Sequence, residues 1–143
     1  MQISPHIVVP DASRAAEWYR TVLGAEEESR IALPDGKLMS VVLRVGDSVL
    51  HLSDEFPDMG VLSPLSIGGT AVVLSLTTDD VDALWQRALD GGADVRQTLG
   101  DTFWGERHGQ ITDPFGHRWN LAQHVRDVPP DEVAREAAKA FGY

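Results

Sequence analysis

The hydrophobic positions change their spacing in a regular order along the chain, and that order predicts the elements of the fold. A short run rich in β-branched residues, 3–9, predicts a first strand. Apolar residues then recur at three- and four-residue spacing up to Leu23, which predicts an amphipathic helix with Asp11 as its N-cap and Gly24 just beyond its end. Turn sequences separate the three strands that we expect next, at residues 26–33, 38–45 and 48–53.

The second half of the chain repeats this order. A strand at 70–77 precedes a helix that is capped by Asp79 or Asp80 and ends at the Gly91-Gly92 pair. Three further strands are expected at residues 95–103, 108–112 and 117–123. Leu50-His51-Leu52 has its counterpart 69 residues later in Trp119-Asn120-Leu121. Two copies of one unit are too few for a solenoid.

The repeat therefore predicts one α+β domain, covering residues 1–143, built from two βαβββ modules. Its expected parts are module one (1–54), a connection (55–69), module two (70–124) and a C-terminal helix (129–141). The last helix has a thin apolar side. It could pack on the body, pack on a second subunit, or fray at the surface.

Alternation along the strands separates two kinds of side chain. Leu50 and Leu52 point to one face of the first sheet while His51 and Ser53 point to the other, and Asn120 alternates in the same way with its apolar neighbours. The apolar face suits burial under the two helices. The mixed face must meet water, a partner or a cleft, and polar residues at central strand positions favour a cleft, with a half-solvated face as the alternative.

Composition narrows the function. The chain has 143 residues with 12 Lys plus Arg against 22 Asp plus Glu, a net charge of −10, which disfavours nucleic acid and anionic membrane surfaces as partners. The absence of cysteine excludes disulfides, thiolate nucleophiles and sulfur-ligated metals. The chain has neither a signal-peptide pattern nor a run of about 20 apolar residues, so a cytoplasmic location is expected.

Five short phrases of the sequence, spread from the first helix to the turn before the last strand, are distinctive. They are Trp18-Tyr19-Arg20 with Leu23-Gly24-Ala25, Val45-Gly46-Asp47-Ser48, Leu52-Ser53-Asp54-Glu55, Phe103-Trp104-Gly105-Glu106-Arg107, and Asp113-Pro114-Phe115-Gly116-His117. Together with the repeated unit they resemble the vicinal oxygen chelate superfamily, which includes glyoxalase I, bleomycin-binding resistance proteins and extradiol dioxygenases, and within it the PhnB-like group. The resemblance covers nearly the whole chain. It implies that the two modules curl into an incomplete barrel around a cleft, with the helices outside, and that the protein forms a homodimer.

The resemblance also implies four positions for metal ligands, on the first and last strands of each module. Counted back from the helix caps and along the last strands, these positions hold Ser4, His51, Val73 and Asn120. Only His51 is an ordinary ligand of divalent metals. His6 shares the face of Ser4, but two histidines without a carboxylate leave a metal site incomplete. We therefore predict no metal and no cofactor.

The candidate ligand-binding residues are polar or aromatic side chains at strand positions that face the cleft or end it. Phe103 and Trp104 offer flat apolar surface, and Arg107 offers a planar cation that suits an aromatic or carboxylate-bearing ligand. An Arg107 in a surface ion pair is the alternative. No catalytic residue is assigned. The set is His6, His51, Ser53, Phe103, Trp104, Arg107 and Asn120.

The sequence thus predicts a small-molecule binding protein without an intact metal site, and its acidity favours cationic ligands such as a sequestered basic drug. The alternative is an enzyme. It could be a metal-dependent lyase, isomerase or dioxygenase in which Glu106 or a residue from a partner subunit joins His6 and His51 as a ligand, or it could work without metal through a histidine as acid and base. A third possibility is a module that only dimerises. The sequence leaves the choice between binding and catalysis open.

Overall fold

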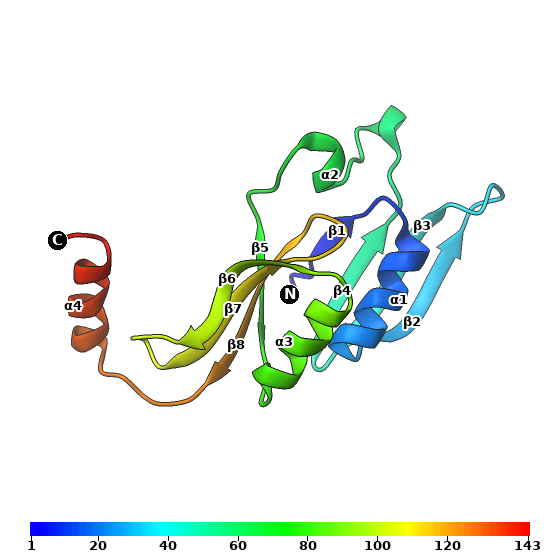
Figure 1. The fold of residues 1–143 in the computed structure, drawn as a ribbon. Helices are drawn as coiled ribbons and strands as arrows, with labels where there is room; N and C mark the ends of the chain where they lie inside the picture. The colour runs from blue at the N-terminus through cyan, green and yellow to red at the C-terminus, as the bar shows by residue number, and fades with distance from the viewer.

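The computed structural model describes all residues, 1–143, and contains both repeats (Figure 1). Module one comprises β1 (His6–Val8), α1 (Ala12–Leu23), β2 (Glu26–Ala32), β3 (Leu38–Val45) and β4 (Ser48–Ser53). Module two comprises β5 (Val73–Thr77), α3 (Val81–Asp90), β6 (Asp94–Asp101), β7 (Glu106–Thr112) and β8 (Arg118–His124). The connection holds a single 3-10 turn (Pro57–Met59) and the one-turn helix α2 (Pro64–Ile67), and α4 (Pro130–Ala140) ends the chain.

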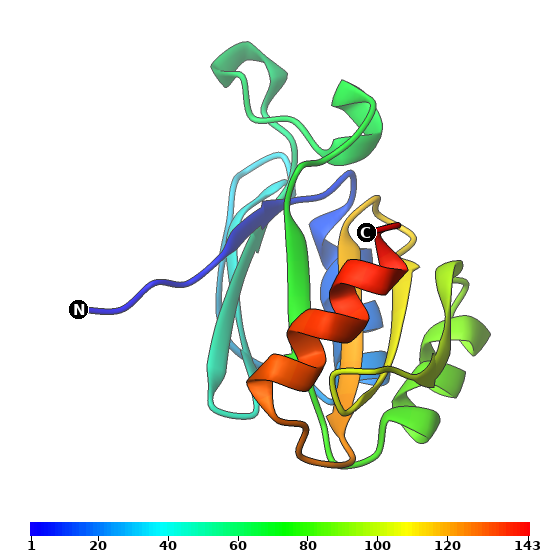
Figure 2. The same ribbon diagram turned by 90° about the vertical axis from the view of Figure 1, so that its left-hand side faces the viewer.

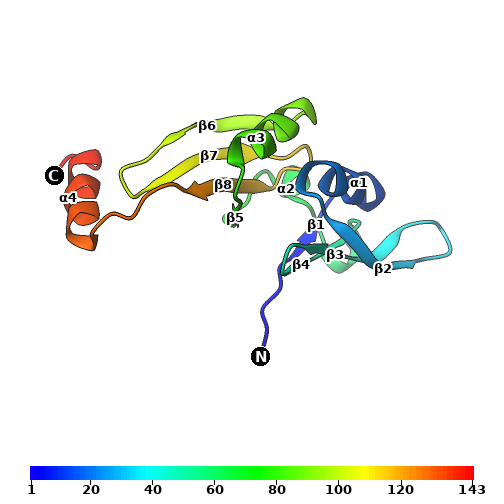
Figure 3. The ribbon, with the colours of Figure 1, turned by 90° about the horizontal axis from the view of Figure 1, so that it is seen from below.

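Each module forms one four-stranded mixed sheet. The strand orders are β1-β4-β3-β2 and β5-β8-β7-β6, and in both sheets the first strand runs parallel to the last while the other pairs are antiparallel. The helices α1 and α3 lie side by side on the same side of the two sheets (Figure 3). The predicted α+β class and the two βαβββ modules are confirmed. The sheets do not close into a barrel.

Local chemistry explains where the two long helices begin. The carboxylate of Asp11 accepts a hydrogen bond from the backbone N–H of Arg14 at 3.1 Å, and Asp80 accepts one from Ala83 at 3.2 Å. Each carboxylate satisfies an N–H that the helix itself leaves without a partner. At the other end of α1, Gly24 takes a left-handed conformation with φ of 69°, which a glycine adopts without a steric cost.

One continuous apolar core lies between the helices and the sheets. Tyr19 of α1 is fully buried, and Trp85 of α3 is 9% exposed, so both belong to this core. The sheets contribute their leucines, such as Leu52 and Leu121, both fully buried. Burying each such side chain contributes about 1.5–3 kcal/mol. The opposite face of the sheets, turned away from α1 and α3, is called here the open sheet face.

The turn before β8 joins the two modules. The buried carboxylate of Asp113 accepts hydrogen bonds from the backbone N–H groups of Phe115 and His117, from Trp119 Nε1 and from the hydroxyl of Tyr19 in module one. The Nε2 atom of His117 lies 2.8 Å from the carbonyl oxygen of Val8 in β1. His117 thus supports this turn and also ties it to the other module.

Some predicted strands are shorter in the structure. The first was expected over 3–9, but β1 covers only His6–Val8, and the segment before it runs away from the body (Figure 2). Strand β5 begins at Val73, whereas the prediction began at residue 70, and β6 ends at Asp101, two residues before the predicted end at 103.

The C-terminal helix lies outside the core. No residue of α4 is buried, and the helix stands apart from the sheets (Figure 1). No helix is long and apolar enough to cross a membrane.

Candidate functional site

The parallel pairing of β1 with β4 brings His6 beside His51 on the open sheet face. Their rings stack with centroids 6.4 Å apart and an interplanar angle of 9°. The Nε2 atom of His6 lies 3.2 Å from the hydroxyl oxygen of Ser53, which is the next residue on the same face of β4. Three of the seven candidate residues therefore lie together in module one.

The environment of His6 favours its neutral form. Partial burial lowers the pKa of His6 below its ordinary value of 6.5, and the neighbouring His51 lowers it further because two positive rings would repel each other. A neutral imidazole has one N–H donor and one nitrogen acceptor. His6 can therefore exchange hydrogen bonds with a ligand at neutral pH without carrying a charge.

Module two places a second polar pair at the matching position. Strand β5 pairs with β8 so that Ser75 lies beside Asn120, and the amide nitrogen of Asn120 donates to the Ser75 hydroxyl at 3.1 Å. Gln110 of β7 donates to the Asn120 carbonyl oxygen at 2.9 Å. Sequence reasoning missed Ser75 and Gln110. The 69-residue repeat held the signal for Ser75, which stands in the place of His6.

The register corrects the positions expected on the two first strands. His6 and Ser75 lie beside His51 and Asn120, whereas Val73 lies beside Arg118 and Ser4 precedes β1 altogether. Counting from the helix caps gave the correct face but a position two residues too early. The count could not detect this because the strand period of two leaves the face unchanged.

The four central positions of the two modules do not suit a catalytic divalent metal. They hold two imidazoles, a hydroxyl and an amide, without the carboxylate or third imidazole that such sites use. No group of three or more His, Asp or Glu side chains is arranged to hold a metal ion. No chemical step is therefore assigned to a metal here.

Phe103 and Trp104 lie at the far end of the open sheet face, in the turn between β6 and β7. Their rings meet edge to face with centroids 4.9 Å apart, and Trp104 meets His108 in the same way at 5.5 Å. The indole N–H of Trp104 donates to Glu106 at 2.6 Å, and the indole is 39% exposed. Glu106 and His108 alternate onto the face of Gln110, so this aromatic group belongs to the same surface as Asn120.

Arg107 points the other way. Its guanidinium pairs with Asp82 of α3 at 2.8 Å and with Asp101 at 3.5 Å, and these carboxylates raise the pKa of Arg107. Strand alternation turns Arg107 away from its neighbours Glu106 and His108. The structure therefore places Arg107 in the ion pair considered as the alternative, and it does not bring Arg107 to the other six candidate residues.

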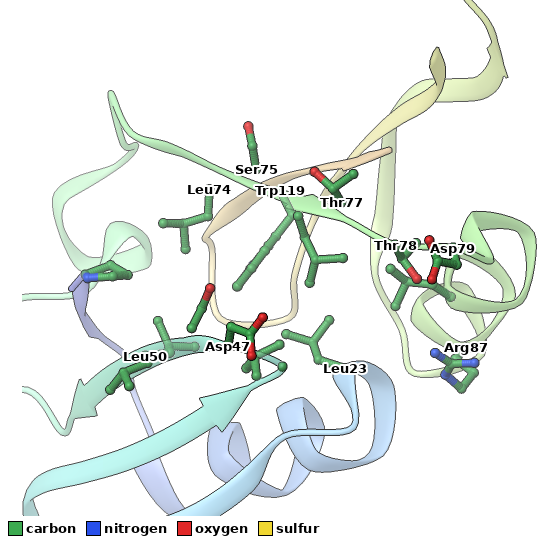
Figure 4. A pocket seen from close by; sticks show the side chains of 17 residues that line it. Leu23, Asp47, Leu50, Leu74, Ser75, Thr77, Thr78, Asp79, Arg87 and Trp119 are labelled. Carbon is green, nitrogen blue, oxygen red and sulfur yellow. The ribbon is translucent and has the colours of Figure 1, made fainter. Parts of the chain in front are cut away.

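A cavity of about 840 Å³ opens between the modules (Figure 4). Its lining includes Leu23 and Leu50 from module one and Leu74 and Trp119 from module two. None of the seven candidate residues lines it, although Ser75 does. Sequence reasoning could not find this cavity, because its walls come from both modules and depend on how they sit together.

Comparison with known proteins identifies related sequences and structures. Residues 3–121 match the model of the Glyoxalase/Bleomycin resistance protein/Dioxygenase superfamily. The uncharacterized protein Rv0887c of Mycobacterium tuberculosis is 46% identical over 134 residues, which cover 92% of this chain and 79% of that protein.

Two solved structures have similar folds. Protein PA1353 from Pseudomonas aeruginosa superposes with a TM-score of 0.74 and 26% identity over 88% of this chain and 99% of its own. A bleomycin resistance determinant encoded on the transposon Tn5 superposes with a TM-score of 0.62 and 21% identity, covering 87% of this chain and 98% of its own. At that identity the likeness concerns the fold. The match over residues 3–121 shows that this chain belongs to the Glyoxalase/Bleomycin resistance protein/Dioxygenase superfamily.

Proposed function

We propose that this protein binds a small molecule on its open sheet face and works without a bound metal. The observation that carries the proposal is the pairing of His6 with His51 and of Ser75 with Asn120 at matching positions of the two modules. These groups supply hydrogen-bond donors and acceptors, and none of them is a carboxylate. Such a set orients a polar ligand but leaves a catalytic metal site incomplete.

The aromatic residues extend the proposed site. Trp104 and Phe103 offer ring surface at one end of the face, and Glu106 beside them carries a negative charge. An aromatic ring next to a carboxylate favours a flat or cationic group. The chain's net charge of −10 adds a long-range attraction for cations. Basic aromatic compounds are therefore the proposed ligand class. Sequestration of a drug of this class is one role that the protein would then have.

The enzyme alternative needs a carboxylate near the histidines, and Glu106 was the candidate. Glu106 already accepts the indole hydrogen bond of Trp104. It lies four residues along β7 from Gln110, a separation of about 13 Å along a strand. Within one chain this position gives no support to Glu106 as a third ligand beside the histidines.

We further propose that the protein acts as a homodimer. The apolar residues Val133, Ala137 and Phe141 follow one side of α4 at four-residue spacing, and Phe141 is 81% exposed. Ile3 in the extended N-terminal segment is 95% exposed. Exposed apolar side chains at both ends of the chain favour a partner surface, and a second copy is the partner that the family resemblance implies.

A ligand screen with matched variants tests the binding proposal. Thermal-shift measurements with basic aromatic compounds should yield ligands that stabilise the protein, since a ligand at 100 times its Kd adds about 2.7 kcal/mol. His51→Ala and Asn120→Ala should weaken binding of these ligands about tenfold, whereas Ser13→Ala on the exposed side of α1 should not. Ligands that bind equally well to all three variants would refute the proposed site.

A further inference from the structure

The cavity between the modules shares only Ser75 with the proposed site and has the size of a ligand pocket. Its volume of about 840 Å³ lies within the usual range for small-molecule sites of roughly 300–1,000 Å³. Module one contributes the end of α1 and the turn between β3 and β4. Module two contributes β5, the two residues that follow it (Thr78 and Asp79), Leu84 and Arg87 of α3, and Trp119.

About half of the wall of this cavity is apolar. The side chains of Leu23, Leu50, Leu74 and Trp119 converge on it from both modules (Figure 4). Leu74 and Leu76 pack against the core but are only partly buried, although they lie on the helix-facing side of β5. An apolar group inside the cavity would therefore cover leucine surface that the fold leaves accessible, which is a favourable change.

Its charged groups favour a cation. Asp47 and Asp79 line the cavity, and neither carboxylate takes part in a hydrogen bond or ion pair in the structure. Arg87 is the one basic residue in the lining, and it uses Nε to bond the carbonyl oxygen of Val22 at 3.0 Å. The lining thus carries two carboxylates and one guanidinium. Figure 4 shows Asp47 among the apolar side chains, apart from Arg87.

We infer that this cavity binds an amphipathic amine, a molecule with one ammonium group and an aliphatic or aromatic body. The body packs against Leu23, Leu74 and Trp119, and the ammonium group pairs with Asp47. Asp47 is exposed, so solvent screens its attraction for the ammonium group, and burial of the apolar body contributes the larger share of the affinity. This second site is independent of the histidines on the open sheet face.

The test uses 4-phenylbutylamine as the probe, with its uncharged analogue 4-phenylbutanol and the anion 4-phenylbutyrate. In two-dimensional ¹H–¹⁵N NMR spectra of the whole chain, the amine should shift the amide signals of residues 46–49 and 74–79. The alcohol should bind about fivefold more weakly, and the anion more weakly still. Tighter binding of the anion would overturn the inference, because Arg87 would then set the preference.

Variants test whether the carboxylate of Asp47 is the group that binds the ammonium group. Asp47→Asn keeps the shape of the turn and should weaken amine binding about fivefold while leaving alcohol binding unchanged. Asp58→Asn makes the same charge change on an exposed turn outside the cavity and should leave the affinity unchanged. Because the amine is also a basic aromatic compound, its affinity for the cavity is taken only from the signals of residues 46–49, which belong to the cavity lining and not to the proposed sheet-face site. A failure here is therefore distinct from a failure of the proposed function.

Two further results would refute the inference. One is a wild-type affinity in Asp47→Asn. The other is a set of shifts in residues 46–49 and 74–79 that follows protein concentration instead of added amine, which would show that a second copy of the chain occupies the cavity.

Discussion

The hydroxyl of Tyr19 donates a hydrogen bond of 2.5 Å to the carboxylate of Asp113, and 94 residues of sequence separate the two. Tyr19 is fully buried, and Asp113 is only 3% exposed. Burial and the nearby carboxylate raise the pKa of Tyr19 well above 10, so its hydroxyl remains a donor throughout the neutral range. This bond joins α1 of module one to the turn that begins β8 of module two.

Removing that hydroxyl should destabilise the fold. Tyr19→Phe keeps the ring but leaves one oxygen of a buried carboxylate with Trp119 as its only remaining donor. A hydrogen bond to a charged group contributes about 1.5–3 kcal/mol, and we expect a loss of about 2 kcal/mol in the free energy of unfolding. Urea denaturation measures it, with Tyr143→Phe at the exposed C-terminus as the control. A loss below about 0.5 kcal/mol would show that the bond contributes little.

A glycine in β7 should tolerate no side chain. A Cβ atom on Gly109 would lie 2.5 Å from Trp85 Cζ3 and 3.1 Å from the Cα atom of Leu99. Because Trp85 is buried in the core, Gly109→Ala should cost about 1–3 kcal/mol through overpacking. Gly100→Ala in the adjacent strand, where a Cβ meets nothing within 4 Å, is the matched control. Equal thermal midpoints for the two variants would contradict this packing.

The sequence predicted those elements whose causes are local. Asp11 and Asp80 cap helices through their own side chains, so the helix starts could be found without knowing the rest of the fold. Arg107 shows the limit of such reasoning. It follows Phe103 and Trp104 closely in sequence, but strand alternation turns it toward Asp82 on α3, which only the tertiary structure places there. The cavity between the modules could not be predicted for the same reason.

The stacked histidines predict a pH dependence. Because the folded protein holds the pKa of His6 below its unfolded value of about 6.5, the unfolded state takes up this proton first as the pH falls. The contribution of His6 to stability should be complete above pH 6.5 and decline below it. His51→Asn removes the neighbouring charge, so the pKa of His6 measured by NMR titration should rise toward 6.5. An unchanged pKa in this variant would mean that burial alone lowers it.

Arg107 and Trp104 should differ in their effects on binding. Trp104 lies on the open sheet face, and Arg107 lies against Asp82 on the helix side. For a ligand found in the screen, Trp104→Ala should weaken binding about tenfold through lost ring contact. Arg107→Ala should leave the affinity unchanged. Isothermal titration calorimetry separates the two, and a loss confined to Arg107→Ala would place the ligand on the other side of the sheet.

The most direct test of binding without a metal is the metal content of the protein itself. Untagged protein should be purified without chelators, alongside His51→Ala, and analysed by elemental mass spectrometry. The two imidazoles, one hydroxyl and one amide at the central positions predict far less than one metal atom per chain, with no difference between the two proteins. Near-stoichiometric nickel, zinc, iron or manganese that is lost in His51→Ala would contradict this account and establish a metal centre at the histidine pair.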